Sequence, residues 1–418
     1  SMASGRLDVA RRIVAEAERL WRDLPAATDA GRRSMEVSIL TARGQVERLA
    51  GNGEEAMAAY DRALRLLAES EAGEERDGRE ANLRVCRGLA ALSGDSEADW
   101  RRAIEDFDAA ILARSKSVDS PAARWGRAAA WINRGEAFGK LGGREDLEEV
   151  LRSNDEAIRC LEDFDLCENP AFRTRLALAR MNQGLALARL CEAHGDQRRE
   201  FCLEAFTKAA GVLRPGLHEG NAETPRVLAV VLANSSRTRF AFAKAGSPEG
   251  EVEAREALSL IAESDPGDWE LTRLDLSLRL NLCGMLERGV RAMEISDLAE
   301  EGLDRLRRAR VGGEPPSGIP ELAGQLLLQG AEAYLESQAR FLCEYLLDYL
   351  DPERHATTLA DWAPCQEAAT RVLWKAVGRF QRDGFGSGGP DDFHRELDLQ
   401  DAVQQCRQRL AQVRAVLF

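Results

Sequence analysis

The sequence lacks any long hydrophobic run. Its longest candidate is VLAVVLA at residues 227–233, which is far short of the ~20 apolar residues that cross a bilayer as a helix. The first residues, SMASGRLDVARR, contain no apolar core of a secretory signal peptide. We therefore expect a cytoplasmic protein.

Patterns of cysteine and histidine that carry chemistry are also missing. The nine cysteines are an odd number, lie scattered along the chain and form no CxxC pair, which is typical of small buried side chains in a reducing compartment. The four histidines have no HExxH spacing or neighbouring ligand set, and no GxSxG motif occurs. We therefore expect no enzyme activity, no metal site and no cofactor.

Thr, Tyr and Ile are scarce, whereas Ala, Leu, Arg and Glu dominate. This composition favours helix almost throughout, so the predicted class is all-α. A chain of 418 residues exceeds the size at which one compact core keeps growing, which indicates several domains or one elongated stack. The formal charge is −14, from 57 Lys+Arg against 71 Asp+Glu. Because this charge repels phosphate backbones and anionic lipid, we expect no direct nucleic-acid partner and no membrane partner.

One helical-hairpin unit recurs along the chain. Its clearest copy is LTARGQVERLAGNGEEAMAAYDRALRLLAES, residues 40–70, in which AGNG forms the turn between two amphipathic helices. Gly44 on the first helix is followed by Ala56, Tyr60 and Ala63 on the second. Small residues equivalent to Gly44 recur 44 to 52 positions apart, as Gly44, Gly88, Gly135, Gly184, Ser236 and Cys283.

The second helix of each unit carries a pair of positions seven residues apart, which share one helix face. Most of these residues are small, so that two helices can approach closely there. The pairs are Ala56/Ala63, Ala103/Ala110, Val150/Ala157, Cys202/Ala209, Gly250/Ala257 and Ser296/Leu303.

This pattern resembles the tetratricopeptide repeat family, which has small residues at positions 8, 20 and 27 of its unit and an aromatic residue at position 24. The aromatic residue is present as Tyr60, Phe107 and Phe206. The resemblance implies a right-handed superhelical solenoid of antiparallel helical hairpins. The units here exceed the ~34 residues usual in the family, and we expect long helices together with lengthened loops at SGDSEADW, GGREDLEE and CEAHGDQRRE.

Glycine and proline indicate the domain organisation. We predict an N-terminal capping helix within 1–35, a repeat array of about six hairpins over 36–311, a linker at 312–320 (GGEPPSGIP) and a C-terminal helical cap over 321–418. Gly330 allows a seventh hairpin within the cap. The helix expected over 321–350 is apolar on more than one side, so either the last helices or a second chain must cover it. A homodimer through this end is therefore one alternative.

Asparagine recurs two residues before the small position of four successive units. The separations are 49, 52 and 47 residues. In arrays of the family this face lines the concave groove, where an amide can pair with the backbone of a bound peptide. The alternative is that these side chains bond to neighbouring helices or face water. The four residues are Asn133, Asn182, Asn234 and Asn281.

Basic residues occupy further positions of the repeat that face the groove in the family. A few cations in an otherwise acidic protein favour an acidic segment or a free C-terminal carboxylate as ligand. Solvated surface charge is the alternative. The residues are Lys140, Arg189, Arg237 and Arg288.

Three functions remain open from the sequence. The leading hypothesis is a non-catalytic scaffold that binds a peptide or helix of a partner protein in its concave groove. The second is a regulatory or sensor subunit that controls a separate effector enzyme such as a protease or nuclease. The third is a structural protein that assembles with itself through the C-terminal helices.

Overall fold

The structure is a computed structural model. It describes residues 2–23, 29–116, 119–164, 169–243 and 247–310, apart from positions 220, 222, 263, 265 and 266, together with a few positions between 316 and 333. Apart from those few positions, the predicted C-terminal cap at 321–418 lies outside the described residues. The same holds for the seventh hairpin and for the dimer contact through this end.

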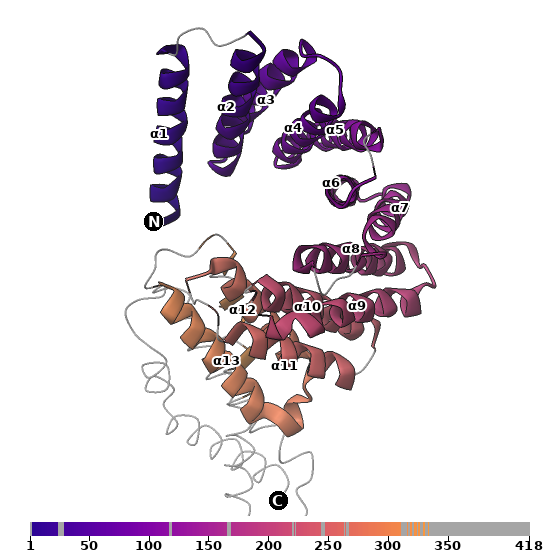
Figure 1. Cartoon of the computed structure of the whole chain (residues 1–418). Coiled ribbons are helices and arrows are strands. Elements are labelled where there is room, and N and C mark those ends of the chain that lie inside the picture. The colour runs from indigo at the N-terminus through magenta and orange to yellow at the C-terminus, as the bar shows by residue number, and fades with distance from the viewer. Residues whose placement is uncertain are drawn as a thin grey trace, which may run out of the picture. The chain divides into compact units, whose positions relative to one another are not determined.

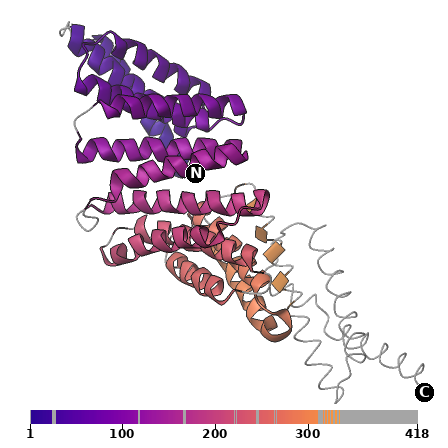
Figure 2. The same cartoon turned by 90° about the vertical axis from the view of Figure 1, so that its right-hand side faces the viewer.

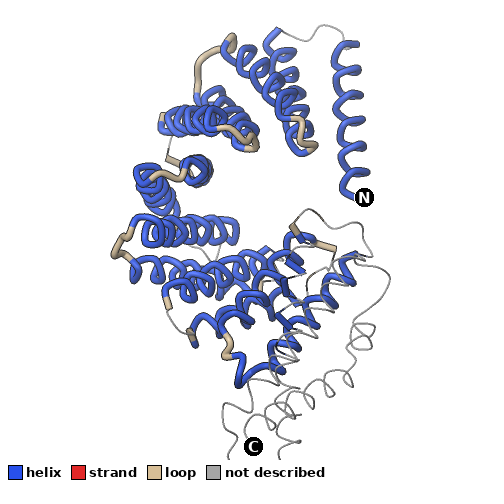
Figure 3. Tube along the Cα trace, turned by 180° about the vertical axis from the view of Figure 1, so that it is seen from behind, coloured by secondary structure: helices blue, strands red, loops and turns tan. Residues whose placement is uncertain are grey.

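The described residues form helices joined by short connections and contain no strand (Figure 3). The predicted all-α solenoid of helical hairpins is thereby confirmed. In chain order the helices are α1 (Met2–Asp23), α2 (Asp29–Leu49), α3 (Gly53–Ala68), α4 (Glu74–Leu92), α5 (Glu97–Ser115), α6 (Pro121–Leu141), α7 (Arg144–Leu161), α8 (Pro170–His194), α9 (Arg199–Leu213), the short 3-10 helix η1 (Arg214–His218), α10 (Glu223–Phe242), α11 (Pro248–Ala262), α12 (Trp269–Met285) and α13 (Arg288–Arg310).

The chain divides into two compact units, Ser1–Thr238 and Arg239–Phe418, which we call unit 1 and unit 2. In unit 1 consecutive helices pack side by side and form an arc (Figure 1). The first helices of the hairpins, α2, α4, α6 and α8, lie on the inner side of this arc. Seen from the side, the helices cross the stack in successive rows (Figure 2). Side chains of α6 and α8 are therefore placed to form one inner surface.

Glycine and an aromatic ring set the spacing within three hairpins of unit 1. A Cβ on Gly44 would lie 2.5 Å from Cε1 of Tyr60, and a Cβ on Gly88 would lie 2.7 Å from Cε1 of Phe107. The three rings, including Phe206, are fully buried. Because no side chain larger than hydrogen fits beneath the ring, glycine allows the close approach that the repeat pattern predicted.

The hairpin α6/α7 has an asparagine where those three hairpins have an aromatic residue. Asn154 is fully buried, and its Nδ2 donates to the carbonyl of Val150 at 2.8 Å. Its Oδ1 is buried without a hydrogen-bond partner. A Cβ on Gly135 would lie 2.9 Å from Asn154 Nδ2, so the polar side chain still occupies the place of the ring.

The extra length of the repeats lies in the helices, which are long as predicted, whereas the prediction of lengthened loops is wrong. The sequence SGDSEADW contains the start of α5, where Ser96 accepts a hydrogen bond from the backbone of Asp99. The sequence GGREDLEE follows the end of α6 directly and contains the start of α7. There Gly142 adopts a left-handed conformation, and Asp146 accepts from the backbone N–H of Gly143 at 3.1 Å. The polar residues in these segments therefore cap helices.

Unit 2 follows the repeat pattern with one shift. The predicted pair Gly250/Ala257 is buried on α11, but on α13 Ser296 is only half-buried while Ile295 and Gly302 are buried. The buried pair of this hairpin is therefore Ile295 and Gly302, one residue before the predicted pair Ser296/Leu303. The backbone of α13 is non-helical at Arg291, and such a kink changes the face that the following residues present.

Among the described residues, none of the helices combines the length and the apolar character that a membrane span requires.

Candidate functional site

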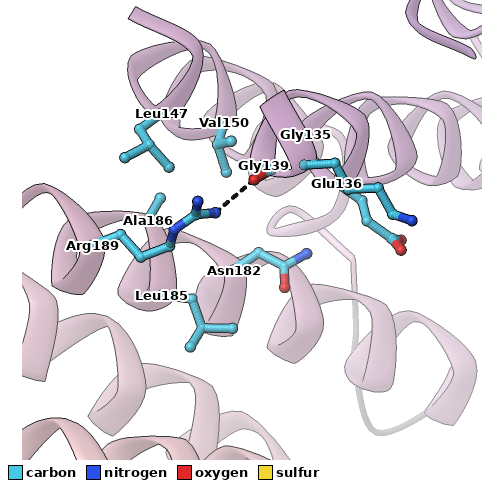
Figure 4. Close-up of a pocket in the computed structure, with 10 residues that line it drawn as sticks. Gly135, Glu136, Gly139, Leu147, Val150, Asn182, Leu185, Ala186 and Arg189 are labelled. Atoms are coloured by element: carbon cyan, nitrogen blue, oxygen red, sulfur yellow. Dashed lines mark hydrogen bonds between the residues drawn. The ribbon is translucent and has the colours of Figure 1, made fainter. Parts of the chain in front are cut away.

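A cavity of about 300 Å³ opens between α6, α7 and α8 in unit 1 (Figure 4). The small side chains on α6 leave room for it, and apolar residues of α7 and α8 form part of its wall. It is lined by Gly135, Glu136, Gly139, Lys140, Leu147, Val150, Asn182, Leu185, Ala186 and Arg189. Three of the eight site residues predicted from the sequence, Lys140, Asn182 and Arg189, meet here.

Asn182 is the polar residue of this cavity with the most freedom to bind. It is half-buried on α8 and makes no hydrogen bond with the described residues. Figure 4 shows its amide between Glu136 and Leu185 at the cavity. A primary amide has donors and an acceptor side by side, which match the N–H and C=O groups of a peptide backbone.

Arg189 is already engaged with the end of α6. Its Nη1 donates to the carbonyl oxygen of Gly139 at 2.6 Å. A Cβ on Gly142, where the helix ends with φ of +77°, would lie 2.8 Å from Arg189 Nη2. The last carbonyls of a helix lack intrahelical partners and favour a positive charge. Arg189 therefore joins the hairpin α6/α7 to α8, and only part of its guanidinium remains for a ligand.

Glu136 is a cavity residue that the sequence analysis missed. It occupies a groove-facing position of α6, next to the small residue Gly135. The residue is exposed, yet protein atoms crowd around its carboxyl, and this burial raises the pKa of Glu136. Lys140, one helical turn further along α6, acts in the opposite direction. No ion pair within 4.0 Å neutralises Glu136 among the described residues.

Lys140 is exposed, and its Nζ lies 5.6 Å from the ring centroid of Trp100 on α5. A cation over an indole ring is held weakly while it stays accessible to solvent. Lys140 is therefore the cation of this cavity that can respond most freely to a ligand charge.

The other predicted residues of unit 1 lie outside the cavity lining. Asn133 is half-buried on α6. Asn234 on α10 donates to the carbonyl of Val230 in its own helix at 3.0 Å and contacts Met181 Sδ at 3.7 Å. Arg237 is exposed, with its Nη2 3.5 Å from Oδ1 of Asn234. For Asn234 the structure thus provides the neighbouring-helix contacts that were the alternative to groove binding.

Two predicted residues belong to unit 2. Asn281 is half-buried on α12, and Arg288 is the first residue of α13. The side chain of Arg288 lies outside the described residues. The four repeated asparagines are therefore divided between two units, and a single groove through all four residues stays a prediction.

The thiols near this part of the chain are not activated. Burial raises the pKa of Cys86, Cys160 and Cys191, and it raises the pKa of Cys202 to about 12. Since the thiolate is the nucleophile, these side chains are unreactive near neutral pH. Within the part of the chain that the structure describes, no group of three or more His, Cys, Asp or Glu side chains could hold a metal ion.

No protein-family model matches the sequence, and no curated protein sequence matches it. Among solved structures, BtubC (BKLC) from P. vanneervenii is similar with a TM-score of 0.43 at 16% identity, over 63% of this chain and 92% of that chain. The apo form of RapI is similar with a TM-score of 0.41 at 13% identity, over 72% of this chain and 97% of that chain. Similarities this weak do not indicate a function. The assignment of the fold is based on the packing of the helices themselves.

Proposed function

We propose that the chain is a non-catalytic interaction scaffold that binds an extended segment of a partner protein on the inner side of unit 1. The observation that carries the proposal is the Asn182 amide, which faces a cavity of about 300 Å³ and makes no hydrogen bond with the described residues. A buried or half-buried amide gains from a ligand that supplies its missing partners. An extended peptide offers such partners whatever its side chains are.

The composition of the cavity supports a peptide as ligand. Leu147, Val150 and Leu185 provide an apolar wall, whereas Glu136 and Lys140 add charge. Binding sites commonly combine an apolar surface with a few convergent polar groups that fix orientation. One side chain of the partner would occupy the cavity while its backbone pairs with Asn182.

The packing of the hairpins supports a place in the tetratricopeptide repeat family. Glycine lies beneath a buried ring in the hairpins of Gly44, Gly88 and Gly184. This contact joins the two positions that the family pattern links by spacing.

The charge preference of the partner depends mainly on Lys140. Arg189 is bound to Gly139, and Glu136 opposes an acidic ligand at the same cavity. We therefore propose that an acidic residue or C-terminal carboxylate, if the partner has one, pairs with Lys140.

A selected peptide tests this function. Random peptides displayed on phage are selected for binding to the full chain. The affinities of the selected peptides are then measured for the wild type, Asn182→Ala and Gln183→Ala. Gln183 is the matched control because it lies next to Asn182 on α8 but bonds to Asp155. We expect Asn182→Ala to weaken binding by about 10-fold or more, since two hydrogen bonds are lost.

We expect Gln183→Ala to retain the affinity, and both variants to melt like the wild type. Equal affinities of Asn182→Ala and the wild type for every selected peptide would exclude the amide as the binding group.

A further inference from the structure

Two arginines from different helices meet at the beginning of α6. Arg114 on α5 lies directly against Gly126, where any Cβ would collide with its Cζ. Arg175 on α8 stacks on Trp125 with its Cζ 3.5 Å from the ring centroid, and its Nη1 donates to the Trp125 carbonyl at 2.9 Å. The two guanidinium groups thus lie against consecutive residues of one helix. We call Arg114 and Arg175 the arginine pair.

Neither member of the arginine pair has a carboxylate within 4.0 Å among the described residues. Arg114 Nη2 donates to the neutral amide of Asn82 at 2.5 Å, and Arg114 Nε is buried without a hydrogen-bond partner. Glu223 acts on Arg175 only from beyond ion-pair distance. By contrast, the nearby arginines 124 and 127 both pair with Asp119.

The surroundings disfavour the charged form of both arginines. Burial, followed by the positive charge of Arg114, lowers the pKa of Arg175 to about 10. Burial also lowers the pKa of Arg114. Desolvation and a like charge both disfavour a cation. A chain with a formal charge of −14 has many acids that could have neutralised this place, but none reaches it in the part of the chain described.

We infer that the arginine pair is a binding site for a phosphate monoester dianion. A phosphate monoester carries a charge of about −1.5 to −2 at pH 7 and three strong acceptor oxygens. It can therefore neutralise both guanidinium groups at once and accept from the donors that Trp125 and Asn82 leave free. A carboxylate has only one charge to share between two arginines. The site is separate from the cavity at Asn182 and does not rest on the proposed function.

Calorimetric titration of the full chain with inorganic phosphate, in a buffer free of other multivalent anions, tests the inference. We expect saturable binding that weakens as salt is added, because the attraction is electrostatic. Arg114→Gln and Arg175→Gln should each weaken it by about 10-fold or more. Arg101→Gln is the matched control, because Arg101 lies on α5 but is 62% exposed, and we expect it to leave binding unchanged.

A further variant and a second anion complete the test. If Arg175→Gln does not fold, Arg175→Lys keeps the charge but loses the planar fork, and it should still weaken binding. Acetate should bind more weakly than phosphate. Absence of phosphate binding to the wild type, equal affinity for acetate, or binding that survives in the folded arginine variants would overturn the inference and leave both arginines as packing contacts.

The source of the phosphate group is distinguished with a short peptide that carries a central phosphoserine flanked by alanines. Tighter binding of this peptide than of inorganic phosphate would assign the site to a phosphorylated partner protein. Equal affinities would assign it to a small phosphorylated molecule. Asn182→Ala should leave phosphate binding intact in either case, so a failure of the groove proposal does not affect this test.

Discussion

Tyr60 covers Gly44 so closely that a Cβ on the glycine would lie 2.5 Å from Cε1 of the ring. The ring is fully buried, and Phe107 and Phe206 lie over Gly88 and Gly184 in the same way. These contacts determine how near the two helices of a hairpin come. They therefore also determine which face of each inner helix is left for a ligand.

Gly44→Ala should destabilise the protein by about 1–3 kcal/mol, because the added methyl group forces the ring or the helices apart. Gly78→Ala is the control, since Gly78 lies inside α4 with nothing within 4 Å of its Cβ position. That change should stabilise by up to ~1 kcal/mol through helix propensity. Urea unfolding measures both, and equal effects would contradict the packing argument.

Asp106→Ala should also destabilise the protein. Asp106 is 1% exposed and accepts from Arg87 Nε at 2.8 Å and from Nη2 at 2.5 Å. Its removal leaves a partly buried guanidinium without its main partner, which costs about 2–4 kcal/mol. Glu97→Ala breaks a pair in which both side chains are more than 60% exposed, and its unfolding midpoint in urea should stay close to that of the wild type.

Asp196 should contribute to stability against acid. Hydrogen bonds from Arg198 lower the pKa of Asp196 from its usual value near 3.8 to about 2. Because the folded-state pKa is lowered, the contribution is fully present above about pH 4 and is lost as the pH falls towards 2. Asp196→Asn should remove it, so that the difference between the variant and the wild type shrinks as the pH falls through about 2.

The measurement is urea unfolding at a series of pH values, with the exposed Asp95→Asn as control. A difference between Asp196→Asn and the wild type that persists unchanged at pH 2 would show that the carboxylate charge is not its cause.

Glu136→Gln should stabilise the protein slightly at pH 7. Burial raises the pKa of Glu136 above its usual value near 4.5. The folded protein therefore takes up this proton more readily than the unfolded chain, and stability falls as the pH rises through that range. The advantage of the variant should disappear below about pH 4, where the carboxyl is protonated in both states. Thermal melting at pH 7 and pH 3.5 measures it, with the exposed Glu105→Gln on α5 as control.

Local spacing predicted much of the fold, because the contacts concerned are local. A glycine and a ring sixteen residues later, such as Gly44 and Tyr60, meet within one hairpin, so their pattern reports their packing directly. The last hairpin was predicted one residue out of frame, since the kink at Arg291 leaves no local signal in composition. The loop prediction failed because Ser96 and Asp146 cap helices rather than extend turns.

The candidate site could be predicted only in part. Asn182 and Lys140 follow from the repeat frame, and the structure brings both to one cavity. The contact between Arg189 and Gly139 joins two hairpins, and no spacing within one unit reveals it. Glu136 follows the small residue Gly135 directly, so the repeat spacing also predicts that it faces the groove.

Photo-crosslinking tests the central claim most directly. The photoreactive residue p-benzoylphenylalanine replaces either Leu185, which lines the cavity, or Leu112 on α5, which is 61% exposed. Each full chain is irradiated with the peptide selected on the wild type. The account predicts crosslinking from Leu185, its loss when Asn182→Ala is added, and none from Leu112. Crosslinking from Leu112 but not from Leu185 would contradict it.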